Sequence, residues 1–120
     1  MNEFPEFMRN PANAIGSRSQ SKGIDGYVFD GIDGSQMAFW QCKIDGESTL
    51  HTHEFDEYFV VLQGRYTLII EGRKVSVSTG QEYFIPKGLP HAGEFVAGTR
   101  TIHAFGGKRA KRAIEEGSEG

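Results

Sequence analysis

The residues best suited to chemistry in this sequence are His51, His53 and Glu57, within the stretch LHTHEFDEYFVVLQG. On a helix, two imidazoles at this spacing would point roughly 200° apart and could not share one metal ion. On a strand they point to the same face, about 6–7 Å apart along the chain, and can converge on one ion. The spacing therefore predicts a metal site in which the two histidines are carried by a strand.

Glu57 is the acid in this stretch that we expect to face the ion. A straight strand from His53 to Glu57 would cover about 13 Å, whereas ligand atoms lie about 2 Å from their metal. The chain must therefore turn within residues 54–56, whose two acids then point to solvent. Glu57 begins the next apolar segment and shares an inward face with Phe59 and Val61. A carboxylate there is costly unless it is paired or bound to metal.

Two further histidines could complete such a site. His91 follows the stiff turn PKGLP and opens the segment HAGEF, so it is well placed for a ligand. His103 lies in the middle of TIHAF, and we expect it in the core or beside the ligands. Cys42 is the single cysteine, which excludes an internal disulfide, and we expect it to be buried in a strand rather than bound to metal.

The elements that must position these residues are short and are separated by glycine, of which the chain has 16. From Tyr27 onward, about eight apolar segments recur roughly every ten residues, which is typical of a β-sandwich or barrel. The 120 residues suffice for one domain. We expect an N-terminal arm over residues 1–25, a β-barrel over 26–107 and a partly helical tail over 108–120.

The charge and hydropathy of the sequence limit the binding partners and the cellular location that we expect for the protein. The net charge is −3, and the basic cluster KRAKR at 108–112 is followed directly by acids. We therefore expect a solvated helix or tail face there, with no nucleic acid or membrane as partner. The first residues lack an apolar signal region, and no apolar run reaches the roughly 20 residues that span a bilayer, so a cytoplasmic location is expected. Strands that are apolar on both faces, such as EYFVVL, favour a homodimer.

Two motifs in the sequence resemble those of the cupin family over about residues 36 to 105. The first motif places a glycine before H-x-H, then a glutamate and a second glycine, at Gly46, His51, His53, Glu57 and Gly64. The second motif places histidine after G-x5-P-x-G, at Gly80, Pro86, Gly88 and His91. The spacing from Gly46 to His51 is one residue shorter than in the commonest form of the first motif. Phe95 stands where the family often has asparagine, which makes a pocket more apolar there but removes no ligand.

The resemblance implies an all-β, double-stranded β-helix (jelly-roll) barrel that holds one ion through His51, His53, Glu57 and His91. Three imidazoles and a carboxylate suit a divalent transition metal, namely Mn, Fe, Ni, Co, Zn or Cu. The function we expect is a metal-dependent enzyme, an oxygenase or isomerase, acting on a small organic ligand, with Glu57 as its catalytic residue. The alternative is a non-catalytic, metal-dependent binding or sensing module. Tyr58, Arg100 and His103 are candidates for supporting the ligands.

Overall fold

Nine antiparallel strands make up most of the part of the chain that the structure, a computed structural model, describes: residues 4–16 and 23–114. Two short 3-10 helices, η1 (Glu6–Met8) and η2 (Pro11–Asn13), precede the strands. The strands are β1 (Ile24–Asp30), β2 (Gln36–Cys42), β3 (Gly46–His51), β4 (Glu57–Gln63), β5 (Arg65–Ile70), β6 (Arg73–Ser78), β7 (Glu82–Ile85), β8 (His91–Phe95) and β9 (Arg100–Phe105).

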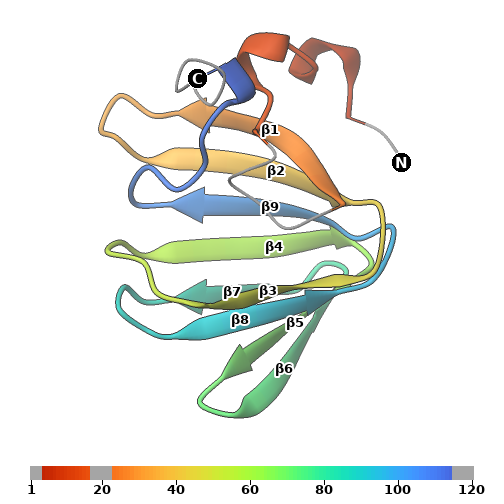
Figure 1. The fold of residues 1–120 in the computed structure, drawn as a ribbon, viewed down its shortest axis with the longest axis vertical. Helices are drawn as coiled ribbons and strands as arrows, with labels where there is room; N and C mark the ends of the chain where they lie inside the picture. Colours follow the sequence, from red (N-terminus) through yellow and green to blue (C-terminus); the bar gives the residue numbers. More distant parts are fainter. Residues whose placement is uncertain (1–3, 17–22, 115–120) are drawn as a thin grey trace.

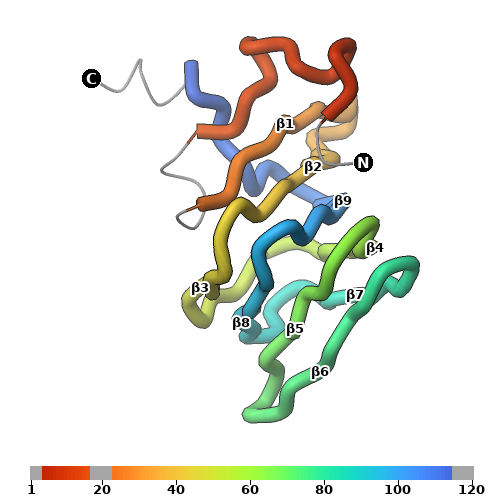
Figure 2. The backbone as a smooth tube through the Cα atoms, turned by 90° about the vertical axis from the view of Figure 1, so that its right-hand side faces the viewer, coloured from red at the N-terminus to blue at the C-terminus, as the bar shows by residue number. Residues whose placement is uncertain are grey.

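The strands form two sheets, as expected for an all-β jelly roll (Figure 1). One sheet has the order β1-β2-β9-β4-β7, and the other has the order β3-β8-β5-β6. Figure 2 shows the chain passing repeatedly between the sheets, so that neighbours within a sheet are often distant in sequence. The last strand, β9, lies in the middle of the five-stranded sheet, between β2 and β4.

Strand β4 shows how side-chain alternation builds the interior. Glu57, Phe59 and Val61 are buried, as predicted, whereas Tyr58 and Leu62 are exposed. The buried side chains gather in two apolar clusters. The first comprises Phe59, Val61, Leu68, Ile70, Val77 and Ile85, and the second comprises Ile15, Val28, Ala38, Phe105 and Ala110. The inward face of β4 therefore carries one carboxylate among apolar side chains, which is the position predicted for Glu57.

The outward face of the five-stranded sheet is also apolar. Strand register aligns one residue from each of the five strands in a row across this face: Phe29, Met37, Ala104, Tyr58 and Phe84. Met37, Tyr58 and Phe84 are 46%, 40% and 52% exposed, and Leu62 of β4 is 45% exposed. We call this row together with Leu62 the outer sheet face.

The N-terminal arm packs on its own chain. Phe4 is buried against the edge of the Tyr27 ring, and the guanidinium of Arg100 lies 4.9 Å from the centre of the Phe4 ring. Phe7, by contrast, is exposed. Phe4 thus has its partners within the described chain.

The segment after β9 runs back beside the arm and β1 (Figure 1). The buried side chain of Gln36 fixes this segment, because its Oε1 accepts hydrogen bonds from the backbone N–H groups of Arg109 and Ala110. Arg112 forms a β-bridge with Ile15, and its guanidinium lies 2.8 Å from a carboxylate oxygen of Asp30.

These contacts correct the expectation of a solvated helix or tail face at residues 108–112. Residues 108–111 have no helical structure, and Arg112 is tied to β1 through Asp30 and the carbonyl of Val28. Residues 113 and 114 are helical, and the remainder of the expected C-terminal helix, residues 115–120, lies outside the described residues. Within residues 4–16 and 23–114, no helix has the length and apolar character needed to cross a membrane.

Gly64 illustrates why the first motif ends in glycine. It joins β4 to β5 with φ of +84°, a conformation that side chains disfavour. A Cβ added at Gly64 would also lie 2.8 Å from the Cα of Thr99. Gly64 is the single residue between the end of β4 and the start of β5, and this tight connection therefore requires glycine.

Candidate metal centre

His51 and His91 face each other across the β3–β8 pair. His51 is the last residue of β3 and His91 is the first of β8, and the two are register partners. The pairing is irregular between Ser48 and His51, so the end of β3 departs from a regular ladder. The centres of the two imidazole rings are 4.4 Å apart. One antiparallel pair therefore supplies two candidate ligands from positions 40 residues apart in sequence.

His53 comes from the loop that follows β3 rather than from the strand itself. This corrects the prediction that one strand carries both histidines. The loop bends at residues 54 and 55, as expected, and is held by backbone hydrogen bonds. The N–H of Gly88 donates to the carbonyl of His53 at 2.9 Å, and the N–H of Gly106 donates to the carbonyl of Asp56 at 2.9 Å. These contacts, rather than a β-ladder, direct His53 to the site.

Asp56 is exposed, as predicted, but it also holds the loop in place through a hydrogen bond. Its Oδ1 accepts a hydrogen bond of 2.9 Å from the backbone N–H of Lys87. Lys87 belongs to the turn that precedes His91, so Asp56 ties the loop of one histidine to the turn of another. Glu54 is also exposed, as expected.

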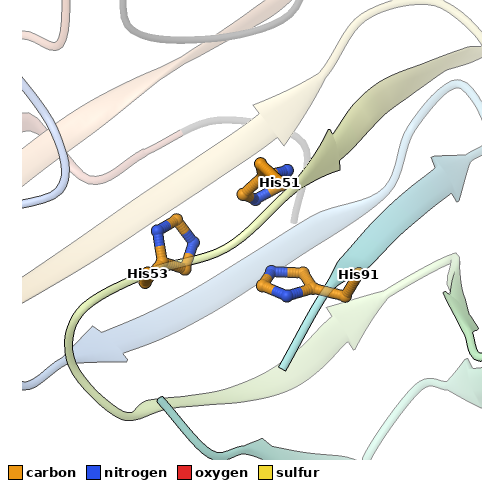
Figure 3. A group of neighbouring side chains, drawn as sticks. All are labelled: His51, His53 and His91. Atoms are coloured by element: carbon orange, nitrogen blue, oxygen red, sulfur yellow. The ribbon is translucent and has the colours of Figure 1, made fainter. Parts of the chain in front are cut away.

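The three imidazoles converge on one point (Figure 3). A ring nitrogen of each of His51, His53 and His91 lies within 4.8 Å of those of the other two. The Nδ1 atoms of His51 and His91 lie 2.6 and 2.9 Å from the carbonyls of Thr49 and Leu89. A carbonyl only accepts, so in each ring Nδ1 carries the proton and the lone pair of Nε2 is available for a metal.

Glu57 lies beside two of these rings. Its Oε1 is 3.3 Å from Nε2 of His53 and 3.6 Å from Nε2 of His91. This oxygen is buried and accepts no hydrogen bond from the described residues. A buried carboxylate oxygen without a donor is costly, so its position among imidazole nitrogens points to a cation as the missing partner.

The other oxygen of Glu57 has a donor, His103. Nδ1 of His103 lies 2.7 Å from Oε2 of Glu57, and both side chains are buried. The His103 ring stacks on Phe59 at an interplanar angle of 13° and on Phe105 at 19°. These two rings belong to different apolar clusters, so His103 lies where the clusters meet. The stacking fixes the imidazole that holds the Glu57 carboxylate.

The surroundings keep Glu57 charged and His51 neutral. Burial alone would raise the pKa of the Glu57 carboxyl, but the imidazoles of His103, His53 and His91 outweigh it and hold the pKa far below its usual range. Burial lowers the pKa of His51, and the charges of neighbouring groups add to this effect. The pKa of His91 is raised, because the Glu57 carboxylate and the Leu89 carbonyl outweigh its burial. A proton on His91 would therefore compete with a metal ion.

This donor set fits a divalent transition metal. Two ligands at about 2.1 Å from an ion, separated by about 90–110°, lie about 3.0–3.4 Å from each other. The 3.3 and 3.6 Å separations around Glu57 Oε1 are close to this range. Three imidazoles and a carboxylate are a mixed nitrogen and oxygen set that suits Mn, Fe, Ni, Co, Zn or Cu. His51, His53 and His91 could thus hold an ion, with Glu57 placed to join them.

A small pocket of about 60 Å³ opens onto these residues. Its apolar walls are formed by Ile24, Trp40, Ile85, Phe95 and Phe105. Phe95 lies in the pocket wall, which matches the more apolar surface expected from its replacement of asparagine. Such walls exclude water, which strengthens electrostatic interactions near the ligands.

Two further ionisable groups of the wall, the Cys42 thiol and the Tyr66 hydroxyl, stay neutral. Burial, with a contribution from the Asp25 charge, raises the pKa of the Cys42 thiol to about 12. Burial and the Glu57 charge also raise the pKa of the Tyr66 hydroxyl. Cys42 is a buried strand residue, as expected, and neither group is an acid or base near neutral pH.

Tyr58, Arg100 and His103, the three residues expected to support the metal ligands, lie in different parts of the structure. His103 reaches Glu57, but Tyr58 lies on the outer sheet face, where its hydroxyl donates to Glu82. Arg100 packs under Phe4. The structure instead brings Arg109 to the pocket wall. Sequence reasoning placed Arg109 in a solvated tail, and its spacing from the motifs carries no signal that would have revealed it.

With this geometry, the chain can be placed among known proteins. The profile of the cupin domain family matches residues 39–106, which is more than half of the chain. The chain belongs to the cupin family, as its two motifs indicated.

Individual relatives agree with this assignment. The fold is similar to that of an RmlC-like cupin from Shewanella frigidimarina NCIMB 400, with a TM-score of 0.71 and 16% identity over 91% of this chain and 96% of that one. It is also similar to KdgF from Halomonas sp., with a TM-score of 0.67 and 20% identity over 79% and 93% of the two chains. A stretch of 37 residues is 51% identical to the acetate kinase EutQ of Clostridioides difficile (strain 630). That match covers 31% of this chain and 24% of the relative.

The four ligands can be tested by metal content. We expect purified protein to carry about one transition-metal ion per chain, and the double variant His51→Ala/His91→Ala to carry none, because two of three converging imidazoles are lost. Metal should be measured by mass spectrometry of the elements after dialysis, with folding checked by circular dichroism. Glu54→Gln removes an exposed carboxylate three residues from Glu57 and should keep the ion. Stoichiometric metal in the folded double variant would refute the site.

The hydrogen bond from His103 makes a second prediction. His103→Phe keeps a ring between Phe59 and Phe105 but removes the donor to Glu57. We expect metal affinity to fall about 10–100-fold, the usual effect of losing a group that orients a ligand. Competition with a chelating dye measures this affinity. Tyr66→Phe, which removes a neighbouring hydroxyl but leaves Glu57 its donor, should change the affinity far less. An unchanged affinity in folded His103→Phe would show that His103 does not orient the ligand.

Proposed function

We propose that this cupin is a metal-dependent enzyme, of the oxygenase or isomerase type, that acts on a small organic substrate. The observation that carries the proposal is the buried, donor-free Oε1 of Glu57, which faces the nitrogens of His53 and His91 at the wall of a small, largely apolar pocket. If Glu57 and the imidazoles served only to stabilise the fold, their stability would not benefit from lying at the wall of such a pocket. An ion held there would have positions left for water or substrate.

One divalent ion of Mn, Fe, Ni, Co, Zn or Cu would be held by His51, His53, His91 and Glu57. When bound, such an ion supplies Lewis acidity or, if it is redox-active, electron transfer with dioxygen. The apolar wall around it keeps bulk water from the reacting atoms. Those wall residues also restrict substrates to molecules, or ends of molecules, that fit the small pocket.

Glu57 and His103 are the pair to which we assign proton handling. Oε2 of Glu57 accepts the hydrogen bond from His103 Nδ1, while Oε1 faces the other imidazoles. The thiol of Cys42 and the hydroxyl of Tyr66 keep their protons near neutral pH. Among the described residues of the pocket wall, Glu57 is the anionic group. Its low pKa makes it a weak base that would hold a proton only transiently, and His103 steadies the carboxylate.

A screen of metals against substrates tests this function. The protein should be loaded with each of the six metals and offered small 2-oxo acids, 2-hydroxy acids, 1,3-diketones and aldoses, in air and under argon. We expect turnover with at least one pair, lost in Glu57→Gln and kept in Glu54→Gln. Oxygen uptake measured by electrode identifies an oxygenase, whereas turnover under argon identifies an isomerase. Saturable binding without turnover in every arm would replace the enzyme with the binding or sensing module.

We also propose that two copies of the chain associate through the outer sheet face. Five strands at about 4.8 Å spacing and about 20 Å of strand length give this sheet face an area of about 500 Å². Phe4 covers part of this face at Tyr27, so two such faces would bury at most about 1,000 Å², the lower limit of specific interfaces. The exposed Met37, Leu62 and Phe84 lie on this face, and Glu82 beside them is engaged by the Tyr58 hydroxyl. Two copies of an exposed apolar face can pack on each other about a two-fold axis, since each then covers the other's apolar side chains.

The dimer is tested by light scattering coupled to size-exclusion chromatography. Wild type should elute as a dimer at micromolar concentration, and Leu62→Glu/Phe84→Glu should elute as a folded monomer, because two charges on each copy would be buried. Leu50→Glu places a charge at an exposed residue of β3, in the other sheet, and should leave the dimer intact. A monomeric wild type would refute the association.

A further inference from the structure

Besides Oε1 of Glu57, two side-chain nitrogens of the pocket wall have no hydrogen-bond partner among the described residues. They are the indole Nε1 of Trp40 and the imidazole Nε2 of His103, and both atoms are buried. Such atoms are rare in protein interiors, because burying a polar group without a hydrogen bond costs free energy. The hydrogen bond between His103 and Glu57 uses the other ring nitrogen of His103, so the two unpartnered atoms have a different role.

Trp40 and His103 lie side by side on the inner face of the five-stranded sheet. In the β2–β9 ladder Trp40 pairs with Thr101 and Ala38 pairs with His103, so the two rings are diagonal neighbours on one face. Their ring centres are 4.6 Å apart, and the ring planes are tilted by 60°. The two nitrogens do not bond to each other, although the rings are close enough for one small group to contact both.

The two nitrogens have opposite hydrogen-bonding character. The indole N–H of Trp40 only donates. Nδ1 of His103 lies 2.7 Å from a carboxylate oxygen of Glu57, which only accepts, so Nδ1 carries a proton and the neutral ring has its lone pair at Nε2. A carbonyl or carboxylate would satisfy the indole but not this lone pair. A hydroxyl is the smallest organic group that accepts from one and donates to the other.

We propose that Trp40 and His103 bind a hydroxyl group of the substrate, whose other end lies at the metal. His103 links these two ends, because its Nδ1 donates to Glu57 while its Nε2 accepts from the hydroxyl. The pocket volume of about 60 Å³ restricts the substrate to a few heavy atoms. This inference rests on the proposed metal-dependent function and narrows its substrates to compact hydroxy compounds, such as 2-hydroxy acids and short aldoses.

The alternative occupant of this position is a buried water molecule, which also donates and accepts. A matched pair of probes separates the two occupants: 2-mercaptoethanol and 1-propanethiol have the same number of heavy atoms and differ in a hydroxyl that replaces a methyl group. Protein loaded with Co²⁺ should be titrated with each thiol without oxygen. The sulfur-to-cobalt charge-transfer absorption reports binding without turnover.

We expect wild type to bind 2-mercaptoethanol about tenfold or more tightly than 1-propanethiol, because a methyl group would leave both nitrogens unpaired. Equal affinities, or a preference for 1-propanethiol, would assign the two nitrogens to water and overturn the inference.

Trp40→Phe tests the donor, because it keeps a ring in the wall but removes the N–H. Trp40 is varied rather than His103, since His103 also donates to Glu57. The variant, shown to be folded by circular dichroism, should lose most of the preference for 2-mercaptoethanol and bind 1-propanethiol almost as wild type does. Tyr66→Phe is the control, because it removes a hydroxyl of the same wall that is hydrogen-bonded to Ser48, and it should keep the preference. An unchanged preference in Trp40→Phe, or an equal loss in both variants, would overturn the assignment.

The indole can also be observed directly, because Trp40 is the single tryptophan of the chain. Its ultraviolet resonance Raman spectrum contains a band that reports hydrogen bonding of the N–H. In protein loaded with Zn²⁺, we expect 2-mercaptoethanol to shift this band and 1-propanethiol to leave it in place. A hydroxyl preference without a shift of the band would place the hydroxyl elsewhere in the pocket and refute the role of Trp40.

The outcomes for this inference and for the metal-dependent function differ. Wild type that takes up metal but binds both thiols equally refutes the hydroxyl site alone. A preference for the hydroxyl, together with no turnover in any arm of the substrate screen, refutes the enzymatic function alone. Protein that takes up no metal refutes the metal-dependent function, and the hydroxyl site that rests on it is refuted with it.

Discussion

The structure depends on one demand, the need to compensate a carboxylate that is buried in an apolar barrel. Glu57 occupies an inward position on β4 next to Phe59, where an unpartnered charge would be expensive. His103 satisfies one of its oxygens, and the other turns toward His53 and His91. These partners come from β9, from the loop after β3 and from the start of β8. Each of those elements is consequently held to the carboxylate by electrostatics as well as by packing.

The candidate ligands are shared between the two sheets. His51 and His91 belong to the four-stranded sheet, Glu57 belongs to the five-stranded sheet, and His53 lies in the loop between them. A bound ion would therefore join the sheets at one point in addition to linking neighbouring residues. Proteins that bind an ion only in the folded state gain stability from it by mass action.

The sequence predicted the parts of the site that depend on local pattern. The alternation of β4 identified Glu57, and the two motifs identified the histidines and the fold. Other features depend on contacts between distant residues and carry no local pattern. His53 was assigned to a strand because spacing alone cannot show that Gly88 and Asp56 hold a loop. Arg109 and Arg112 looked like a solvated tail because their partners, Gln36 and Asp30, are more than 70 residues away.

The place of β9 in its sheet has a consequence for biosynthesis. This strand is the last to leave the ribosome, yet it pairs with both β2 and β4 and joins the two halves of the five-stranded sheet. Until residues 100–105 emerge, the edges of β2 and β4 remain unpaired, and open edges invite pairing with other chains. The five-stranded sheet must therefore wait for residues 100–105, because its closing contacts are non-local. A nascent chain of this protein is most vulnerable to aggregation just before residues 100–105 appear.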